Sequence, residues 1–286
     1  MTSKSEEKKS KYSSLIIPGK PALIFEDATY GSTLVISDLH LGYVYNKNKR
    51  GILLPYKQWP EEDLLDFVER LQPNRLIIIG DFKDEIFGTS NPLVQRVWKF
   101  LNRLLELTSS VVIIKGNHDG KLEEITPENV EVASSTGILA TEKHTGKKIG
   151  LWHGHAIPAL DVMSADITIS AHAHPAYAFR DDVGSKITEK VWVKAKWKSE
   201  EGKERIHIVM PAFNKYIKGF SVDGDFFETI IIMKEGIDFQ KAEVFTLDGV
   251  LIGTIGELQK QRIIHDEKVS KMREELKKNK KKRRSA

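Results

Sequence analysis

Aspartate and histidine recur in this chain directly after short apolar segments, at five successive places. Six of the nine histidines belong to these places. Imidazole and carboxylate groups together suit Mn²⁺, Fe²⁺, Zn²⁺ or Co²⁺. There are more candidate ligands than one tetrahedral ion needs, so the pattern favours two ions that share a carboxylate, an arrangement suited to phosphate hydrolysis. The five motifs are Asp38-Leu39-His40, Gly80-Asp81 with Asp84, Gly116-Asn117-His118-Asp119, His153-Gly154-His155 and His172-Ala173-His174.

The segments that precede these motifs predict buried strands. Each is a short continuous apolar run rich in β-branched residues, as in strands that are covered on both faces. Two amphipathic stretches between them predict helices that begin at Pro60 and Pro92, since proline favours the first helical turn. Alternating strands and helices predict an α/β sheet. Ligands bind outside the carboxyl ends of such strands, so we expect all five motifs at one edge. The predicted strands cover 34–36, 76–79, 111–114, 149–152 and 167–169.

The predicted secondary structure changes after about residue 175, where strands become frequent and helices rare. Alternating patterns predict further strands, with a hairpin turn signal at Asp248-Gly249. We expect them to form a second sheet packed on the first within one domain. The polar residues 1–14 predict a disordered leader, residues 15–256 the domain, and residues 257–286 a basic tail that is helical or disordered. The additional strands are predicted over 191–197, 206–210, 227–233 and 244–255.

Charge is unevenly distributed along the chain. The formal net charge is +4, but residues 260–286 hold twelve Lys or Arg against four Asp or Glu, which is +8, so the rest carries −4. An acidic body suits cation binding, and the tail suits DNA, RNA or simply solubility. The absence of cysteine excludes thiolate zinc sites, iron–sulfur clusters and cysteine nucleophiles. No apolar run is long enough to span a bilayer and no secretory signal is visible, so we expect a cytoplasmic protein.

In order and spacing the five motifs resemble those of the calcineurin-like metallophosphoesterases, over roughly residues 30–220. One departure is Ala171, where that family usually has glycine, but one added methyl group need not disturb the ligands. The chain is most similar to small archaeal and bacterial phosphoesterases, some of which are associated with DNA-repair helicases and ligases. The resemblance implies an α/β fold with two packed mixed sheets flanked by helices, a four-layer α/β/β/α sandwich. Further segments that carry it are Leu41-Gly42, Pro158, Pro175 and Pro211-Ala212-Phe213-Asn214.

The resemblance also implies roles for individual residues. Two divalent ions are expected, with Mn²⁺ as the leading candidate and Fe, Zn, Co or Ni as alternatives. A hydroxide that bridges both ions would attack phosphorus. His118 would bind phosphate and protonate the leaving oxygen, while Asp84 would orient His118 and keep it protonated. The first ion would be held by Asp38, His40 and His174, the second by Asn117, His153 and His172, with Asp81 bridging the two.

The substrate stays open at this level. A phosphodiesterase or nuclease is the leading interpretation. The alternatives are a phosphatase or phosphodiesterase acting on small nucleotides, and a catalytically weak nucleic-acid-binding scaffold. Every expected ligand position is filled, which favours an enzyme. The oligomeric state cannot be read from the sequence.

Other residues receive weaker assignments. The aromatic and basic residues of 43–50 either steer a nucleotide or form a solvated loop. His155 either supports a ligand or substrate or is structural. Asp119 is expected to hold the loop around His118 by hydrogen bonds. No chemistry is assigned to His144, His207 and His265.

Overall fold

The computed structural model describes residues 15–54, 59–85, 91–181, 183–198, 202–224 and 237–284. The leader predicted over 1–14 and the strand predicted over 227–233 lie outside the described residues. Within these ranges, no helix combines the length and the apolar character needed to cross a membrane.

The first sheet contains three of the predicted strands and has the order β1-β2-β3-β4-β5. Its first pair, β1 with β2, is antiparallel, and the remaining pairs are parallel. The central strands are buried on both faces, which explains their continuous apolar sequence. The strands are β1 (Leu23–Asp27), β2 (Gly31–Ser37), β3 (Arg75–Ile79), β4 (Ser110–Ile114) and β5 (Glu131–Ala133).

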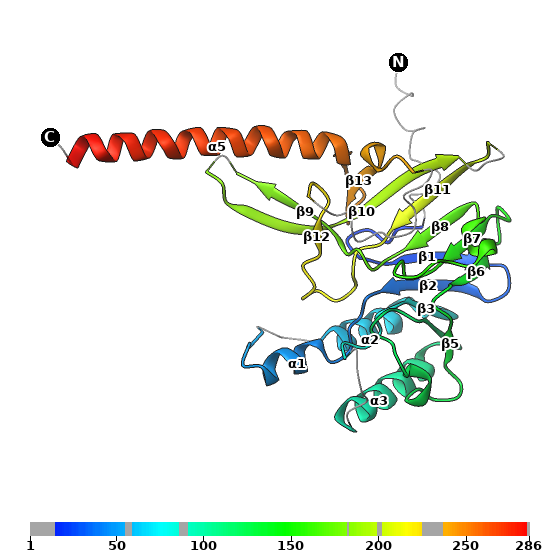
Figure 1. The fold of residues 1–286 in the computed structure, drawn as a ribbon. Helices are drawn as coiled ribbons and strands as arrows, with labels where there is room; N and C mark the ends of the chain where they lie inside the picture. Colours follow the sequence, from blue (N-terminus) through cyan, green and yellow to red (C-terminus); the bar gives the residue numbers. More distant parts are fainter. Residues whose placement is uncertain are drawn as a thin grey trace, which may run out of the picture.

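Helices cover one face of this sheet (Figure 1). Helix α2 (Pro60–Leu71) begins at the predicted proline, and Glu62 Oε2 accepts a hydrogen bond of 3.0 Å from the Trp59 N–H. Helix α3 (Asn91–Leu107) begins one residue before Pro92. Alternate strand residues pack against these helices in one core, among them Leu34, Leu76, Ile78, Val111 and Ile113.

The second sheet packs on the opposite face of the first. Its order is β12-β9-β10-β11-β8-β7-β6, and β13 pairs with both β10 and β14. The core between the sheets joins Val35, Ile77 and Val112 with Ile149 and Ile169. The strands are β6 (Ile138–Thr141), β7 (Lys148–Leu151), β8 (Ile167–Ser170), β9 (Pro175–Arg180), β10 (Lys186–Lys198), β11 (Glu204–Val209), β12 (Phe220–Ser221), β13 (Glu243–Thr246) and β14 (Leu251–Thr254).

Helices also cover the outer face of the second sheet. Val162 of α4 (Leu160–Met163) and Leu258 of α5 (Ile255–Arg284) pack in the third core with strand residues such as Val193. The molecule is therefore an α/β fold of two packed mixed sheets flanked by helices, as predicted. The remaining elements are α1 (Tyr43–Lys49) and the single 3₁₀ turns η1 (Leu122–Glu124) and η3 (Phe239–Lys241).

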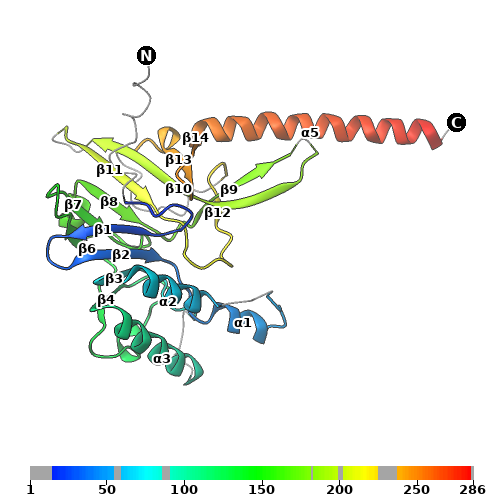
Figure 2. The same ribbon diagram turned by 180° about the vertical axis from the view of Figure 1, so that it is seen from behind.

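Helix α5 extends far beyond the sheets (Figures 1 and 2). Its 30 residues correspond to about 45 Å at 1.5 Å per residue. Ile255 and Leu258, in its first turns, are buried, and Val269 packs beside Gly184 in the turn between β9 and β10. The segment predicted as a tail from residue 257 is thus continuous with a helix that starts in the core.

Candidate metal centre

The carboxyl ends of five strands bring the five motifs together. In the first sheet, Ser37, Ile79 and Ile114 end strands that lie side by side in parallel register. In the second sheet, β7 and β8 are also parallel, and His153 and His172 follow their ends. Main-chain hydrogen bonds join the loops, because the Asp38 N–H donates to the Gly80 carbonyl and the Ala171 N–H to the His153 carbonyl.

The first group of side chains comprises Asp38, His40, Asp81 and His174. One potential ligand atom from each lies within 4.8 Å of the others. His174 Nε2 is 2.9 Å from Asp38 Oδ1, and His40 Nε2 is 3.7 Å from Asp81 Oδ2. Only His174 retains appreciable exposure; the other three side chains are buried.

The second group comprises Asp81, His153 and His172, again within 4.8 Å of one another. His153 Nε2 is 3.6 Å from Asp81 Oδ2 and 3.0 Å from Asp38 Oδ1. Asp81 is therefore common to both groups, and its carboxylate lies between a histidine from each.

Three of these atoms have no hydrogen-bond partner among the described residues, although they are buried. They are Asp38 Oδ2 and both ring nitrogens of His40. A buried polar atom left unpaired costs about 1–3 kcal/mol. Nitrogen and carboxylate donors that converge in this way fit divalent ions, which would satisfy them.

Two of these side chains, Asp38 and His172, have pKa values that favour the metal-binding form, whereas, against the effect of burial, neighbouring carboxylates raise the pKa of His40 and His153. Burial alone would raise the pKa of Asp38, but the adjacent His174 and His153 hold that pKa well below its usual range. Burial, with the neighbouring His153, lowers the pKa of His172 to about 4. Carboxylate and neutral imidazole are the forms that bind a metal ion.

The backbone at the centre is strained. Of the seven described non-glycine residues with positive φ, five are candidate ligands, and the other two are Gln72 and Lys121. Each left-handed residue costs about 1–2 kcal/mol. Such strain persists where the surrounding structure over-determines it, and it concentrates at functional sites. The five are Asp38 (φ 52°), His40 (47°), Asp81 (46°), His172 (64°) and His174 (42°).

Two glycines of the motifs are explained by close approach. A Cβ at Gly80 would lie 2.2 Å from the His153 ring, and one at Gly116 would lie 2.2 Å from both the backbone N and Oδ1 of Asp81. The glycines that precede Asp81 and Asn117 in sequence are therefore required by contacts between motifs.

His118 lies at the rim of the centre and is half-buried. Its backbone N–H donates to Asp81 Oδ1 at 2.9 Å, and its ring Nε2 is 4.0 Å from Asp81 Oδ2. Its ring Nδ1 is 2.8 Å from the main-chain carbonyl of Asp84. A carbonyl only accepts, so Nδ1 carries the hydrogen and Nε2 faces the centre.

The carboxylate of Asp84 lies near both His40 and His118, since one potential ligand atom of each of the three residues lies within 4.8 Å of the others. Its Oδ2 accepts a hydrogen bond of 2.7 Å from Asn46 Nδ2, and its Oδ1 is 3.6 Å from His40 Nδ1. Asp84 thus contacts the His118 ring directly through its main-chain carbonyl, and its carboxylate lies close to His40 and His118.

The two residues that flank His118 differ in burial and in hydrogen bonding. Asp119 is fully buried and accepts hydrogen bonds from the N–H groups of Phe82, Lys83 and Gly116, so its predicted structural role is confirmed. Asn117 is exposed at the tip of the turn, and its amide makes no hydrogen bond to any described residue.

The structure adds supporting residues for which the sequence gave little or no signal. His155 Nδ1 is 2.9 Å from His153 Nδ1, so His155 contacts a candidate ligand directly. Lys83, inside the second motif, donates from Nζ to the His118 carbonyl. Asn214 donates from Nδ2 to the Leu39 carbonyl at 2.9 Å. Its partner is 175 positions away in sequence, which is why only the fold reveals this role.

Comparison with known proteins places the chain in a family. Residues 31–240 match the family model of calcineurin-like phosphoesterases. No curated protein matches the chain in sequence. Among solved structures, nuclease MPE from Pseudomonas putida is similar with a TM-score of 0.47 and 17% identity, over 82% of this chain and 96% of that one. The phosphoesterase YfcE from E. coli gives 0.36 and 15%, over 77% and 96%.

Proposed function

The chain belongs to the calcineurin-like phosphoesterase family and is a metal-dependent hydrolase of phosphoesters; on this basis we propose that it is a two-metal phosphodiesterase that cleaves nucleic acids. The two-metal proposal rests on the position of the Asp81 carboxylate. Asp81 Oδ2 is 3.7 Å from His40 Nε2 and 3.6 Å from His153 Nε2, so one oxygen lies close to a histidine of each group.

In this proposal each ion has its own ligands. When bound, the pair lowers the pKa of water and neutralises the charge of the phosphate. The lack of cysteine leaves nitrogen and oxygen donors, which suit Mn²⁺ as the leading candidate. The ligands are Asp38, His40 and His174 for one ion, Asn117, His153 and His172 for the other, and Asp81 for both.

His118 is the proposed general acid. Its Nε2 faces the centre, where it can bind the phosphate and give a proton to the leaving oxygen. The Asp84 carbonyl fixes the ring from the opposite nitrogen. Asp84 therefore acts as a positioning residue, through its main chain on His118 and through its carboxylate on His40.

Nucleic acid is proposed as the substrate because of the distribution of positive charge. Residues 260–286 carry +8, and most of them lie in α5, which projects away from an otherwise acidic chain. Contact of this segment with DNA or RNA would release counterions from the polyanion.

The first test is a panel of substrates with and without metal. We expect Mn²⁺-dependent hydrolysis of bis-p-nitrophenyl phosphate and of DNA or RNA, faster than that of p-nitrophenyl phosphate, and loss of activity in EDTA. The Asp81→Ala variant is the control for contaminating enzymes. Hydrolysis of the monoester alone would instead identify a phosphatase.

The second test is metal stoichiometry. Elemental analysis should find two Mn²⁺ per chain in the wild type and close to none in Asp81→Ala, because the shared ligand is lost. His174→Ala should keep about one. His144→Ala, an exposed histidine in the β6–β7 turn, should keep two. A single ion at saturating metal in the wild type would contradict the two-metal proposal.

A further inference from the structure

A hollow of about 420 Å³ opens beside the metal centre, on the side of His118. Asp84 and His118 belong both to this hollow and to the centre. The hollow and the centre are therefore adjacent and share two side chains. The lining residues are Tyr43, Asn46, Lys47, Arg50, Asp84, Glu85 and His118.

Helix α1 supplies the opposite wall of the hollow. It begins directly after the first motif, because Gly42 adopts φ 91° and the Tyr43 N–H donates to the His40 carbonyl at 2.9 Å. Val44 is the only buried residue of the helix. Residues 43, 47 and 50 are spaced by four and three, so they share one helical face. The segment that sequence analysis treated as a possible solvated loop is thus a helix that presents an aromatic ring and two cations to the site.

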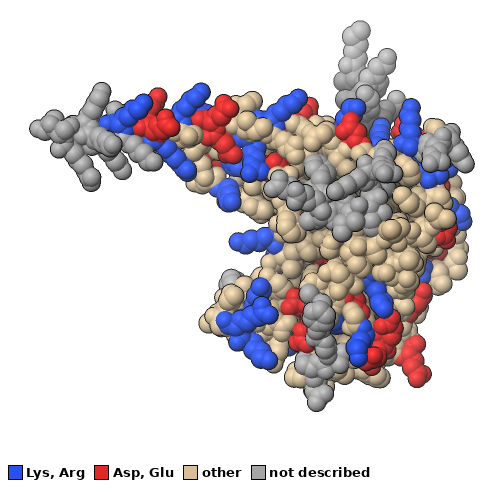
Figure 3. Space-filling view, in the orientation of Figure 1, with Lys and Arg blue, Asp and Glu red and all other residues tan. Residues whose placement is uncertain are grey.

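These cations are available for a ligand. Within the described part of the chain, neither Lys47 nor Arg50 forms an ion pair with a carboxylate. Lys47 Nζ lies 4.9 Å from the centre of the Tyr43 ring. The Asp84 carboxylate, which also lines the hollow, is already held by Asn46. Figure 3 shows Lys and Arg side chains gathered over α1, across an open space from α5.

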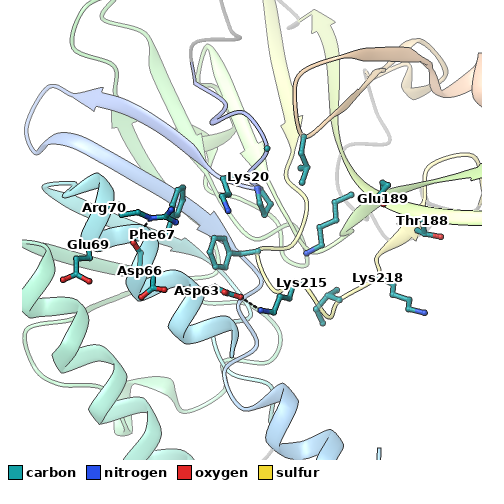
Figure 4. A pocket seen from close by; sticks show the side chains of 16 residues that line it. Lys20, Asp63, Asp66, Phe67, Glu69, Arg70, Thr188, Glu189, Lys215 and Lys218 are labelled. Atoms are coloured by element: carbon teal, nitrogen blue, oxygen red, sulfur yellow. Dashed lines mark hydrogen bonds and ion pairs between the residues drawn. The ribbon is translucent and has the colours of Figure 1, made fainter. Parts of the chain in front are cut away.

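A second hollow, on another part of the molecule, is not connected with the metal centre (Figure 4). It measures about 950 Å³ and lies between α2 and the chain around Phe213 and Lys215. No residue of the metal centre lines it. Its positive side chains are interspersed with Asp63, Asp66 and Glu69, and Lys215 is paired with Asp63 at 2.7 Å. The smaller hollow, where Lys47 and Arg50 lie together with Asp84 and Glu85, is therefore the one that adjoins the metal centre.

We propose that the hollow at α1 holds the leaving-side nucleotide of a single-stranded nucleic acid, with Lys47 and Arg50 on its phosphate and Tyr43 against its base. Phosphate contacts by Lys and Arg position a strand without reading sequence, and base stacking on an aromatic ring needs an unpaired base. We assign the hollow to the leaving side of the substrate because His118, which protonates the leaving oxygen in the proposed function, also lines this hollow. The inference rests on the proposed phosphodiesterase function and on that role of His118.

The test compares two double variants that each remove two positive charges. Lys47→Gln/Arg50→Gln changes the hollow. Lys143→Gln/Lys198→Gln changes exposed lysines at the β6–β7 turn and the end of β10, on the opposite side of the molecule from α1 in Figures 1 and 2. Each is assayed with Mn²⁺ on single-stranded oligodeoxythymidylate, on bis-p-nitrophenyl phosphate, and on an oligonucleotide p-nitrophenyl ester whose nucleotides all lie on the retained side.

We expect the α1 variant to lose about tenfold or more in kcat/KM on the oligonucleotide at low salt, mainly through KM. The slope of log kcat/KM against log salt should become shallower by roughly 1–2. The losses on the two p-nitrophenyl substrates should be several-fold smaller. Tyr43→Leu should reduce oligonucleotide cleavage in the same direction, and the control variant should behave like the wild type.

Other results would overturn the inference and leave the proposed function intact. One is an equal loss of kcat/KM on the oligonucleotide in the α1 variant and the control variant. Another is an equal loss of kcat/KM on all three substrates, which would place the effect at the metal centre. A wild type that hydrolyses bis-p-nitrophenyl phosphate but not the oligonucleotide would also overturn it, and of the proposed function it would leave the two-metal phosphodiesterase without cleavage of single-stranded DNA. By contrast, a wild type with no metal-dependent diesterase activity would refute the proposed function itself. Arg50→Gln alone, at an exposed position, serves if the double variant is unstable.

Discussion

Five candidate ligands adopt a left-handed backbone that their side chains disfavour. This strain lowers the stability of the folded chain, and hydrogen bonds between loops maintain it, such as that from the His40 N–H to the Asp81 carbonyl at 2.9 Å. The benefit is that ligands from separate strands converge at one place. At the scale of single residues, the geometry of the centre is therefore obtained at a cost in stability.

His118 offers a clean test of acid catalysis at this scale. In His118→Asn, the side-chain amide can still donate to the Asp84 carbonyl as Nδ1 does now, while the group at the Nε2 position is lost. We expect bound metal to be unchanged and turnover of DNA to fall about 10²- to 10⁴-fold. The loss should be much smaller for bis-p-nitrophenyl phosphate, whose leaving group needs little protonation. Equal losses on both substrates would leave His118 as a phosphate-binding group only.

At the scale of elements, helix α5 combines two parts with different surroundings. The first part is anchored, since Arg262 Nη1 donates to the Asp223 carbonyl at 3.0 Å and His265 Nε2 is 2.8 Å from the Asp181 carbonyl. Leu258 and Val269 are buried in the same part. A boundary at residue 256 would therefore cut through packed structure, and any truncation that tests the tail must begin later.

Truncation after Glu275 removes residues 276–286, which contain seven Lys or Arg and no acid. We expect nucleic-acid binding to weaken at low salt and to become less dependent on salt, since fewer counterions are released. The thermal midpoint and the rate on bis-p-nitrophenyl phosphate should change little, because the packed part of α5 and all the ligands remain. Fluorescence anisotropy across a salt series provides the measurement. Equal binding by both proteins would make the α1 surface the principal anchor.

At the scale of the whole molecule, His207 links stability to pH. It is fully buried on β11 between two hydroxyl groups of β8, with Nδ1 3.0 Å from Thr168 Oγ1 and Nε2 3.1 Å from Ser170 Oγ. Burial lowers the pKa of His207 to about 3. The folded chain keeps this ring neutral, whereas the unfolded chain binds a proton below a pKa of about 6.5.

The contribution of His207 to the free energy of unfolding is therefore largest above about pH 6.5. It decreases as the pH falls toward about 3, by up to about 1.4 kcal/mol per pH unit. Replacing the ring by His207→Gln should remove this part of the slope, even though the lost hydrogen bonds lower the free energy of unfolding at pH 7. Urea unfolding in EDTA at pH 5, 6 and 7 measures the slopes. His144→Gln, at an exposed position, is the control. A wild-type slope retained by His207→Gln would show that other groups account for it.

Much of the architecture could be predicted from the sequence because its causes are local. Continuous apolar runs specify strands that are buried on both faces, and Pro60 with Glu62 specifies the start of α2. Since polar motifs follow the carboxyl ends of those strands, their meeting at one edge also follows from the sequence. Asp38, Asp81 and His153 could be named on this basis before any distance was known.

Contacts between distant residues were decided only by the tertiary structure. His153 meets Asp38 from 115 positions away, and the Asp84 carboxylate turns toward His40 and Asn46. No local pattern encodes such pairings, because they depend on how two sheets pack and how loops cross between them. The position of α1 opposite His118 likewise depends on tertiary packing and is not encoded by a local pattern. The sequence by itself predicted which strand ends meet at the site, because apolar runs followed by polar motifs are local features; the packing of the sheets and loops decided which atoms face one another there.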